Sequence, residues 1–506
     1  MNIGRSANRL FEPVDIAWLV FFRIAFGAIM LWESMLYIAQ DKIKHLFLTP
    51  VFFFTYFGFE WVKPWPGLGM YIHFYAMAAL SLGILFGLWY RPAAILFFLA
   101  FTYQFLLDQA NYLNHFYLIS LISFLMIFLP ANRAFSLDAL RQPELKSETA
   151  PAWTLWLMRL QIGIPYFYGG LAKFNEDWFR GWPLKTWLPP MNHLPFIGPW
   201  LSEEWVAIFF SYNGLLLDLL IVPALLWKRT RVLAFLAACV FHLLNAWVWH
   251  IGIFPWFMIP ATLIFFSPSF PRHMLNWLGW KVNAFVPPAP QLDSREKHAG
   301  MTKVGSSPHS FSGDQQKRNR LTLILLGLYA AFQLLYPFRH LLYPGKVDWT
   351  EEGHMFSWRM KLRDKQPLKI EFIARNPQTG QKWNVNAFDL LMQRQVYKMS
   401  MCPDMILQFA HYAAKRVKDQ GGFESIEVRA HVVNTLNSRK PQPMINPTVD
   451  LASVRRSYFH QKWVLPLKQP AREFWLGRNT SPEEEARRLR LEMKTYPVTA
   501  TSGVKK

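Results

Sequence analysis

The chain has 506 residues, of which 52% are hydrophobic and 17% aromatic, and its formal net charge is +21. This apolar and aromatic content argues against a soluble protein, and the apolar residues gather in blocks of roughly 18–25, the length of a membrane-spanning helix. The positive charge does not indicate nucleic-acid binding. The basic residues lie in the loops between apolar blocks and in the polar C-terminal third, as membrane topology and lipid headgroups would produce.

The apolar blocks predict a polytopic α-helical membrane protein of roughly nine spans, followed by a C-terminal α+β extramembrane domain. The first block is too long for a cleavable signal peptide and lacks a small-residue cleavage site, so it predicts a membrane helix. The spans are expected at residues 14–39, 69–89, 92–107, 113–130, 152–172, 204–227, 231–249, 252–268 and 321–340.

Composition also suggests domain boundaries. Residues 270–320 are polar and basic and contain Pro287-Pro288 and Gly305-Ser-Ser-Pro308, which is typical of a linker. The expected organisation is a transmembrane bundle over 1–269, a cytoplasmic linker over 270–320, a last transmembrane helix over 321–340, an extracytoplasmic domain over 341–480, and a charged helix and tail over 481–506.

The polar domain shows alternating and helical patterns. Residues 368–373 and 383–388 predict a β-hairpin because Asn376-Pro-Gln-Thr-Gly380 between them supplies turn residues. Residues 404–418 have helical spacing that Gly421-Gly422 should end, and residues 426–433 alternate as a third strand. Ser481-Pro followed by three glutamates predicts the start of a charged helix.

The distribution of Lys and Arg orients the chain. With a cytoplasmic N-terminus, the cytoplasmic connections carry Arg5, Arg9, Arg91, Arg133, Arg141, Lys146, Lys228, Arg229, Arg231 and the basic residues of 272–320. The other side carries only Lys42, Lys44, Lys63, Lys173, Arg180 and Lys185. This bias agrees with the positive-inside rule and places residues 341–506 outside the cytoplasm, on the same face as Lys173.

Lys173 ends the fifth apolar block, in Gly169-Gly-Leu-Ala-Lys-Phe-Asn-Glu-Asp-Trp. A lysine at membrane depth either extends to the interface or occupies a cavity with a function. Burial disfavours the ammonium form, and a neutral amine is a competent general base. The spacing alone leaves both interpretations open.

Two histidines mark further polar positions. His115 follows Asn114 where a polar cluster opens the fourth span, and it could hydrogen-bond a substrate oxygen or belong to an ordinary capped loop. His242 and Asn245 share a helix face in a later span, where polar groups bind a ligand or join helices. A zinc site is only weakly indicated because no acidic ligand lies at a useful interval. The many aromatic residues suit a flat lipophilic ligand such as a quinone, or ordinary packing.

Several segments together resemble the vitamin K-dependent gamma-glutamyl carboxylases, in a shortened, bacterial-type form. In order and spacing they cover roughly residues 14–470. The segments are Phe22-Arg-Ile-Ala-Phe-Gly, Gly87-Leu-Trp-Tyr-Arg91, Phe105-Leu-Leu-Asp-Gln with Asn114-His115-Phe-Tyr-Leu, the Lys173 segment, Gly214-Leu-Leu-Leu-Asp-Leu, Phe241-His-Leu-Leu-Asn with Ile251-Gly-Ile-Phe, Phe356-Ser-Trp-Arg-Met, and Asn446-Pro-Thr-Val-Asp450-Leu.

The resemblance implies an enzyme that uses vitamin K hydroquinone (menaquinol or phylloquinol), O2 and CO2. In that family a lysine deprotonates the hydroquinone, oxygen is captured, and the resulting strong base removes a γ-proton from a peptide glutamate, which then adds CO2 while the quinone leaves as its epoxide. Lys173 aligns with the lysine, and His115, beside Asn114, aligns with a histidine tied to epoxidation. Quinone-binding positions are implied at His242, Phe254, Met360, Trp358 and His340.

The chain departs from the animal pattern in three places. Ala172 stands where animal members have a second lysine, which leaves one candidate base. Residues 40–68 contain no cysteine, so the link that joins this loop to the outer domain in animal members cannot form, and Cys402 has no evident partner. The long β-rich C-terminal region is not present, which puts recognition of a propeptide in doubt.

The expected partners are a glutamate-containing peptide or protein and the lipid bilayer, in a bacterial inner membrane or, for a eukaryotic chain, the endoplasmic reticulum. No metal and no nucleic acid are expected, and the sequence does not indicate an oligomeric state. Two other functions fit the same pattern. One is quinol oxidation or epoxidation without carboxylation, and the other is a non-catalytic membrane receptor or transporter, although we find no internal repeat of the transporter type.

Overall fold

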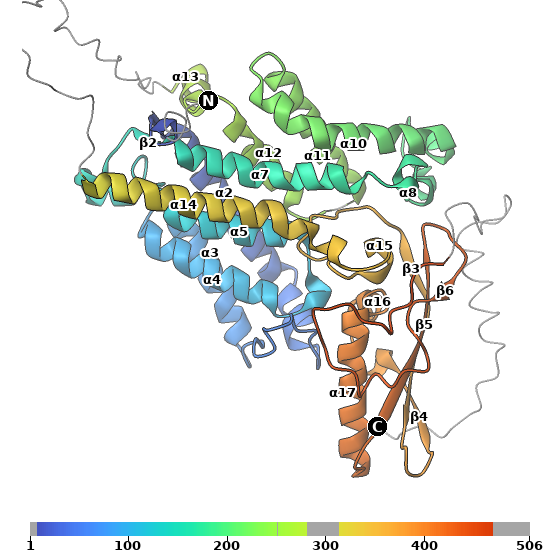
Figure 1. Ribbon diagram of the computed structural model, residues 1–506. Coiled ribbons are helices and arrows are strands. Elements are labelled where there is room, and N and C mark those ends of the chain that lie inside the picture. Colours follow the sequence, from blue (N-terminus) through green and yellow to red (C-terminus); the bar gives the residue numbers. More distant parts are fainter. Residues whose placement is uncertain (1–7, 250, 281–312, 469–506) are drawn as a thin grey trace, which may run out of the picture.

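The protein consists of a helical bundle and a smaller domain with a sheet that packs against one end of the bundle (Figure 1). The computed structural model describes residues 8–249, 251–280 and 313–468. The buried apolar residues form one large cluster in the bundle and a second in the C-terminal domain. Each part therefore has its own hydrophobic core.

A helix overlaps each of the nine expected spans. These helices are α2 (Ala17–Ala39), α3 (Gly69–Phe86), α4 (Tyr90–Leu106), α5 (Asn114–Phe128), α7 (Ala152–Ala172), α10 (Glu204–Leu226), α11 (Arg231–Trp249), α12 (Phe254–Thr262) and α14 (Gly313–Leu335). Among the described residues, five helices are long and apolar enough to cross a membrane: Ala17–Ala39, Gly69–Phe86, Glu204–Leu226, Arg231–Trp249 and Asp314–Leu342. The helical membrane bundle is thus confirmed, whereas the exact count of nine spans is not.

The segment expected to be a linker differs in part from that expectation. Its first residues form helix α13 (Phe270–Trp277), which has a proline in its first turn, where the missing amide hydrogen is tolerated. Helix α14 begins at Gly313 rather than 321, and the Gln315 amide donates to Asn319 Oδ1 (3.0 Å) on its polar first turns. Residues 281–312, which make up most of the linker, lie outside the described residues.

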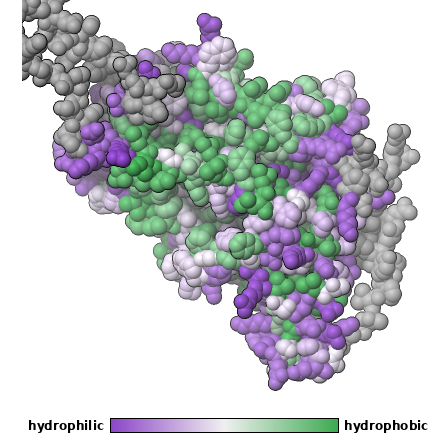
Figure 2. Space-filling view, in the orientation of Figure 1, coloured by the Kyte–Doolittle hydropathy of each residue, from purple (hydrophilic) through white to green (hydrophobic). Residues whose placement is uncertain are grey.

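The surface of the bundle is apolar where a soluble protein would be polar. Leu233 on α11 is 73% exposed and Leu328 on α14 is 64% exposed. Figure 2 shows hydrophobic residues over much of the bundle and mainly hydrophilic ones over the C-terminal domain. Such continuous apolar surface is covered by lipid in a membrane protein.

The C-terminal domain has an antiparallel sheet of strand order β4-β3-β5-β6 with two helices packed on it. Its elements are β3 (Lys365–Arg375), β4 (Lys382–Val385), α16 (Gln393–Met399), α17 (Pro403–Gly421), β5 (Glu427–Leu436) and β6 (Gln442–Pro443). The predicted hairpin, helix and third strand are confirmed. Gly422, with φ +63°, ends α17 in the left-handed conformation. The charged helix expected from Ser481 lies outside the described residues.

At the end of the bundle away from this domain, Arg23 fixes the loop that follows α5. Its buried guanidinium donates to the carbonyls of Ala131 (2.6 Å), Ala134 (3.2 Å) and Phe135 (2.5 Å). A buried cation needs such acceptors because it has lost its hydration. Arg23 therefore joins helix α2 to this loop.

At the opposite end, one buried ion pair joins the domain to the bundle. Asp177, in helix α8 (Glu176–Phe179), accepts from Arg439 Nη1 (2.9 Å) and Nη2 (2.5 Å) and from the Asn437 amide (2.9 Å). Burial alone would raise the pKa of the Asp177 carboxyl, but the hydrogen bonds and charge of Arg439, with Asn437, lower it. The pair is therefore present at neutral pH and weakens only as pH falls through this lowered pKa.

We expect Arg439→Met to loosen the C-terminal domain from the bundle. The substitution leaves the Asp177 carboxylate buried without its cation, which costs about 3–5 kcal/mol when a buried pair is broken. The measurement is thermal unfolding in detergent together with limited proteolysis between the two parts. Arg429→Met, at a 43% exposed side chain on β5, is the matched control and should change little. Equal behaviour of the two variants would contradict the assignment.

Candidate active site

Helix α7 positions Lys173 at its C-terminal end. Lys173 is the C-cap residue, and its Nζ turns back to donate to the Gly169 carbonyl (3.2 Å). The chain then starts α8 at once, since Asn175 Oδ1 accepts from the Trp178 amide (3.0 Å) as an N-cap. The side chain of Lys173 is only 9% exposed. It does not extend to water, so simple snorkelling does not describe it.

Lys173 has a carboxylate partner, Asp218 of α10. Nζ donates to Asp218 Oδ2, and the Trp178 ring lies 5.1 Å from Nζ on another side. The Asp218 side chain is 8% exposed. Asp218 lies in Gly214-Leu-Leu-Leu-Asp-Leu, a segment that carries the family resemblance, but no role was predicted for it. An acidic residue inside an apolar span was the signal that could have identified it, because such residues pair with other polar groups.

Two glycines on α7 allow α10 to approach this closely. A Cβ at Gly169 would lie 3.1 Å from Asp218 Oδ2 and 3.7 Å from Met360 Cε. A Cβ at Gly170 would lie 2.7 Å from Leu219 Cδ2. Small residues at helix contacts bring backbones together in membranes. The glycine pair therefore lets Asp218 reach Lys173.

A segment of the C-terminal part, residues 355–362, enters the bundle beside this pair. Trp358 is 1% exposed and its ring stacks on Tyr117, with centroids 4.8 Å apart. Met360 lies close to Gly169, and Leu362 packs in an apolar cluster with Trp178. Because Trp358 and Met360 lie on one short segment, this insertion brings both predicted residues to the bundle.

The Phe254 ring contacts both predicted histidines, His115 and His242. The Phe254 ring is 5.7 Å from His115 in a stacked arrangement and 5.7 Å from His242 in an edge arrangement. The Tyr166 hydroxyl lies 2.6 Å from His242 Nε2. Tyr166 precedes Lys173 by seven residues, so this cluster lies on the order of 10 Å deeper along α7.

Both imidazoles retain unused hydrogen-bonding atoms. His242 Nδ1 is buried without a partner among the described residues, and the His115 ring, 9% exposed as a residue, makes no hydrogen bond to them. Buried polar atoms in proteins nearly always have partners. These atoms could therefore hold the oxygens of a ligand whose flat ring contacts Phe254.

Asn114 and His340 lie at the margin of this arrangement. Asn114 accepts from the Tyr112 hydroxyl (2.9 Å) and donates to the Arg359 carbonyl (3.4 Å), so it fastens the inserted segment. His340 Nδ1 lies 2.8 Å from the Pro337 carbonyl, and a Cβ at Gly353 would lie 2.6 Å from His340 Cα. These contacts hold His340 against residues 337 and 353, and neither contact involves His115 or His242.

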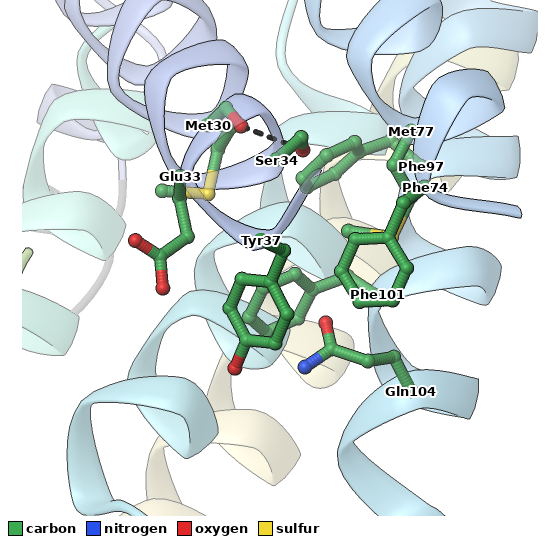
Figure 3. Close-up of a pocket in the computed structure, with 9 residues that line it drawn as sticks. All are labelled: Met30, Glu33, Ser34, Tyr37, Phe74, Met77, Phe97, Phe101 and Gln104. Carbon is green, nitrogen blue, oxygen red and sulfur yellow. Dashed lines mark hydrogen bonds between the residues drawn. The ribbon is translucent and has the colours of Figure 1, made fainter. Parts of the chain in front are cut away.

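A separate crevice between α2, α3 and α4 contains a polar group that the predicted site does not include. Glu33, Tyr37 and Gln104 line it together with apolar side chains (Figure 3). Figure 3 shows the Glu33 carboxylate on one side and the Gln104 amide near the Tyr37 hydroxyl. None of the eight predicted site residues lines this crevice. Among the described residues, no group of three His, Cys, Asp or Glu side chains is placed to hold a metal ion.

We expect Gly169→Ala to destabilise the protein and Gly214→Ala to leave it unchanged or more stable. A methyl at 169 presses on the Asp218 carboxylate, whereas a methyl at 214 would meet Trp178 Cζ2 at an ordinary 3.7 Å. Overpacking costs about 1–3 kcal/mol, while alanine in a helix gains about 0.5–1 kcal/mol over glycine. Thermal unfolding in detergent gives the comparison. The close approach of α10 would be contradicted if both variants gained stability.

Comparison with known families divides the chain into two matched parts. A family model described as the HTTM domain matches residues 11–270. A model described as the lumenal domain of vitamin K-dependent gamma-carboxylase matches residues 318–470. No solved structure matches the chain. The first match covers the bundle up to α13, and the second covers α14 and the sheet domain.

Proposed function

Because the chain belongs to the vitamin K-dependent gamma-glutamyl carboxylase family, we propose that it couples oxidation of vitamin K hydroquinone to its epoxide with CO2 addition to peptide glutamate, with Lys173 as the base. The family match and the apolar helices make it a membrane protein with an extracytoplasmic C-terminal domain. We further propose the bacterial inner membrane as its location. The peptide would then approach from the extracytoplasmic face and the lipophilic quinol from the bilayer.

The observation that supports this proposal most directly is the buried Lys173–Asp218 pair. An amine that accepts a proton from a hydroquinone hydroxyl becomes a cation, and an isolated buried cation is costly. Asp218 Oδ2 is already in contact with Nζ, so the product of proton transfer is neutralised where it forms. Asp218 would thus favour the proton transfer without touching the substrate.

The deeper cluster suits a quinol headgroup. Phe254 offers a flat apolar face between two imidazoles, and His115 and His242 retain free polar atoms beside it. Met360 and Trp358 would close the site from the inserted segment. When bound, reduced vitamin K would supply the electrons and the strong base that glutamate deprotonation requires. The surrounding residues would orient it and keep water away.

We expect Lys173→Ala to lower carboxylation by at least about 100-fold, the usual contribution of general-base catalysis. The assay uses purified protein with reduced vitamin K, labelled bicarbonate and a short glutamate peptide. Small external amines should restore part of the activity by entering the space that the side chain leaves. The control is Lys185→Ala, which removes a lysine in the connection between α7 and α10, paired with Glu204. Full activity of Lys173→Ala would show that another group is the base.

We expect Asp218→Asn to reduce the rate roughly 100-fold, in the range found when one preorganised electrostatic partner is removed. The amide keeps the shape of the side chain but cannot neutralise the ammonium. External amines should not restore this variant because Nζ still occupies its position. Rescue of Asp218→Asn by amines would contradict the partnership.

Quinol oxidation or epoxidation without carboxylation is the second candidate. Its support is the position of the predicted site residues. They lie in the bundle, the turns that follow α14 and the inserted segment, and none lies on the sheet β4-β3-β5-β6. The amount of epoxide formed with and without the glutamate peptide separates the two functions. Glutamate-dependent epoxide with incorporation of label supports the carboxylase, and epoxide formed equally without peptide supports the second candidate.

A further inference from the structure

The turn between α3 and α4 and the segment after α5 enclose a pocket at the end of the bundle. The pocket has a volume of about 350 Å³. Ligand pockets in proteins commonly measure about 300–1,000 Å³, so it can hold a small polar group. Its polar lining includes Arg91, Arg133 and Arg141 with the amides of Asn132 and Gln142.

The lining contains three arginines but only one acidic residue, and the carboxylate of that residue already accepts hydrogen bonds from the protein. Asp138 is the one acidic lining residue, and its carboxylate accepts from the Trp89 amide (2.8 Å), the Tyr90 amide (2.9 Å) and the Asn132 side chain (3.0 Å). The nearest approach of Arg141 to it is 4.0 Å. The pocket therefore has an excess of positive charge that Asp138 does not cancel.

The arginines differ in how far the protein already uses them. Arg91 Nη1 donates to the Ile127 carbonyl. The Arg141 guanidinium lies over the Trp89 ring at 5.5 Å, and its side chain is 52% exposed. Arg133 is exposed and its side chain has no hydrogen bond or ion pair to any described residue. Arg133 and Arg141 are thus available to a ligand.

The pocket lies at the end of the bundle away from the C-terminal domain. Helix α4 begins at Tyr90 beside it and runs about 25 Å to Leu106. Just beyond that other end, Asp108 accepts from Gln395 of the C-terminal domain (2.9 Å). The pocket and the extracytoplasmic domain are therefore at opposite ends of one helix, which places the pocket on the cytoplasmic side.

Exposed apolar side chains flank the arginines. Trp89 is 63% exposed, Phe135 78% and Leu140 68%. Amphipathic aromatic and apolar residues next to arginines are typical of the headgroup region, where cytoplasmic basic pockets bind phosphate-bearing lipids. The guanidinium geometry matches the oxygens of a phosphate.

We propose that the pocket formed by Arg91, Arg133 and Arg141 binds a phosphate group, supplied by an anionic phospholipid of the cytoplasmic leaflet. The ligand oxygens pair with Arg133 and Arg141, and Arg91 adds charge from the start of α4. The acyl chains extend along the exposed apolar residues. This site is separate from Lys173 and does not depend on the proposed reaction.

The test compares the double variant Arg133→Gln/Arg141→Gln with Lys228→Gln/Arg229→Gln. Both remove two positive charges from exposed positions on the cytoplasmic side, but only the first pair lines the pocket. Purified full-length protein in a neutral detergent is titrated with phosphatidylglycerol, phosphatidylcholine or inorganic phosphate. Binding is followed by native mass spectrometry and by the shift in unfolding temperature.

We expect phosphatidylglycerol to bind the wild-type and control proteins alike and the pocket variant roughly 30-fold more weakly, about 5-fold for each arginine. Phosphatidylcholine should bind weakly to all three. Inorganic phosphate that raises the unfolding temperature of wild type but not of the pocket variant would also support the site and would indicate a soluble source. Equal phosphatidylglycerol binding by the two double variants, or binding of neither anion to the wild type, would overturn the proposal.

Discussion

The contact between Lys173 and Asp218 is the constraint around which the outer end of the bundle is arranged. Once Lys173 holds a proton, the pair consists of two opposite charges removed from water, and they must stay in contact because separating them exposes each to an apolar environment. Helices α7 and α10 therefore cannot slide or separate there. Gly169 and Gly170 allow this contact, since any larger residue at either position would hold the two helices too far apart. The inserted segment at Met360 then covers the pair from the side of the domain.

The elements of the fold were largely predictable from the sequence because each depends on local patterns. Apolar blocks gave the helices, the alternation of residues 426–433 gave strand β5, and Gly422 gave the end of α17. The exact number of membrane-spanning helices was harder to predict from the sequence. Helix α12 has nine residues and contains Pro260, after which a short 3₁₀ turn follows, so apolar length there does not equal helix length. Charged residues also continue α14 beyond the part that composition alone would assign to the bilayer.

The sequence draws attention to several residues of the candidate site but not to the contacts between them. Lys173, His115 and His242 are polar residues in apolar surroundings, which is a signal visible in one sequence. Their partners come from distant segments, such as Asp218, 45 residues from Lys173 in sequence, and Tyr166, 76 residues from His242. No local spacing rule links such positions. Arg23 shows the same limit, because no local pattern links it to the carbonyls of residues 131, 134 and 135 to which it donates.

The loop over residues 40–68 contains no cysteine, but hydrogen bonds join it to the C-terminal domain. Thr55 accepts at its carbonyl from Arg456 (2.5 Å) and donates its amide to Gln408 of α17 (2.9 Å), and Arg456 also pairs with Asp404 (2.7 Å). Removal from water raises the pKa of the Cys402 thiol to about 12, so it is a poor nucleophile for disulfide exchange. Charge-assisted hydrogen bonds thus fasten the loop to the domain without a covalent link. Because the Asp177–Arg439 pair fastens the domain at a second point, the inserted segment is held over the site from two sides.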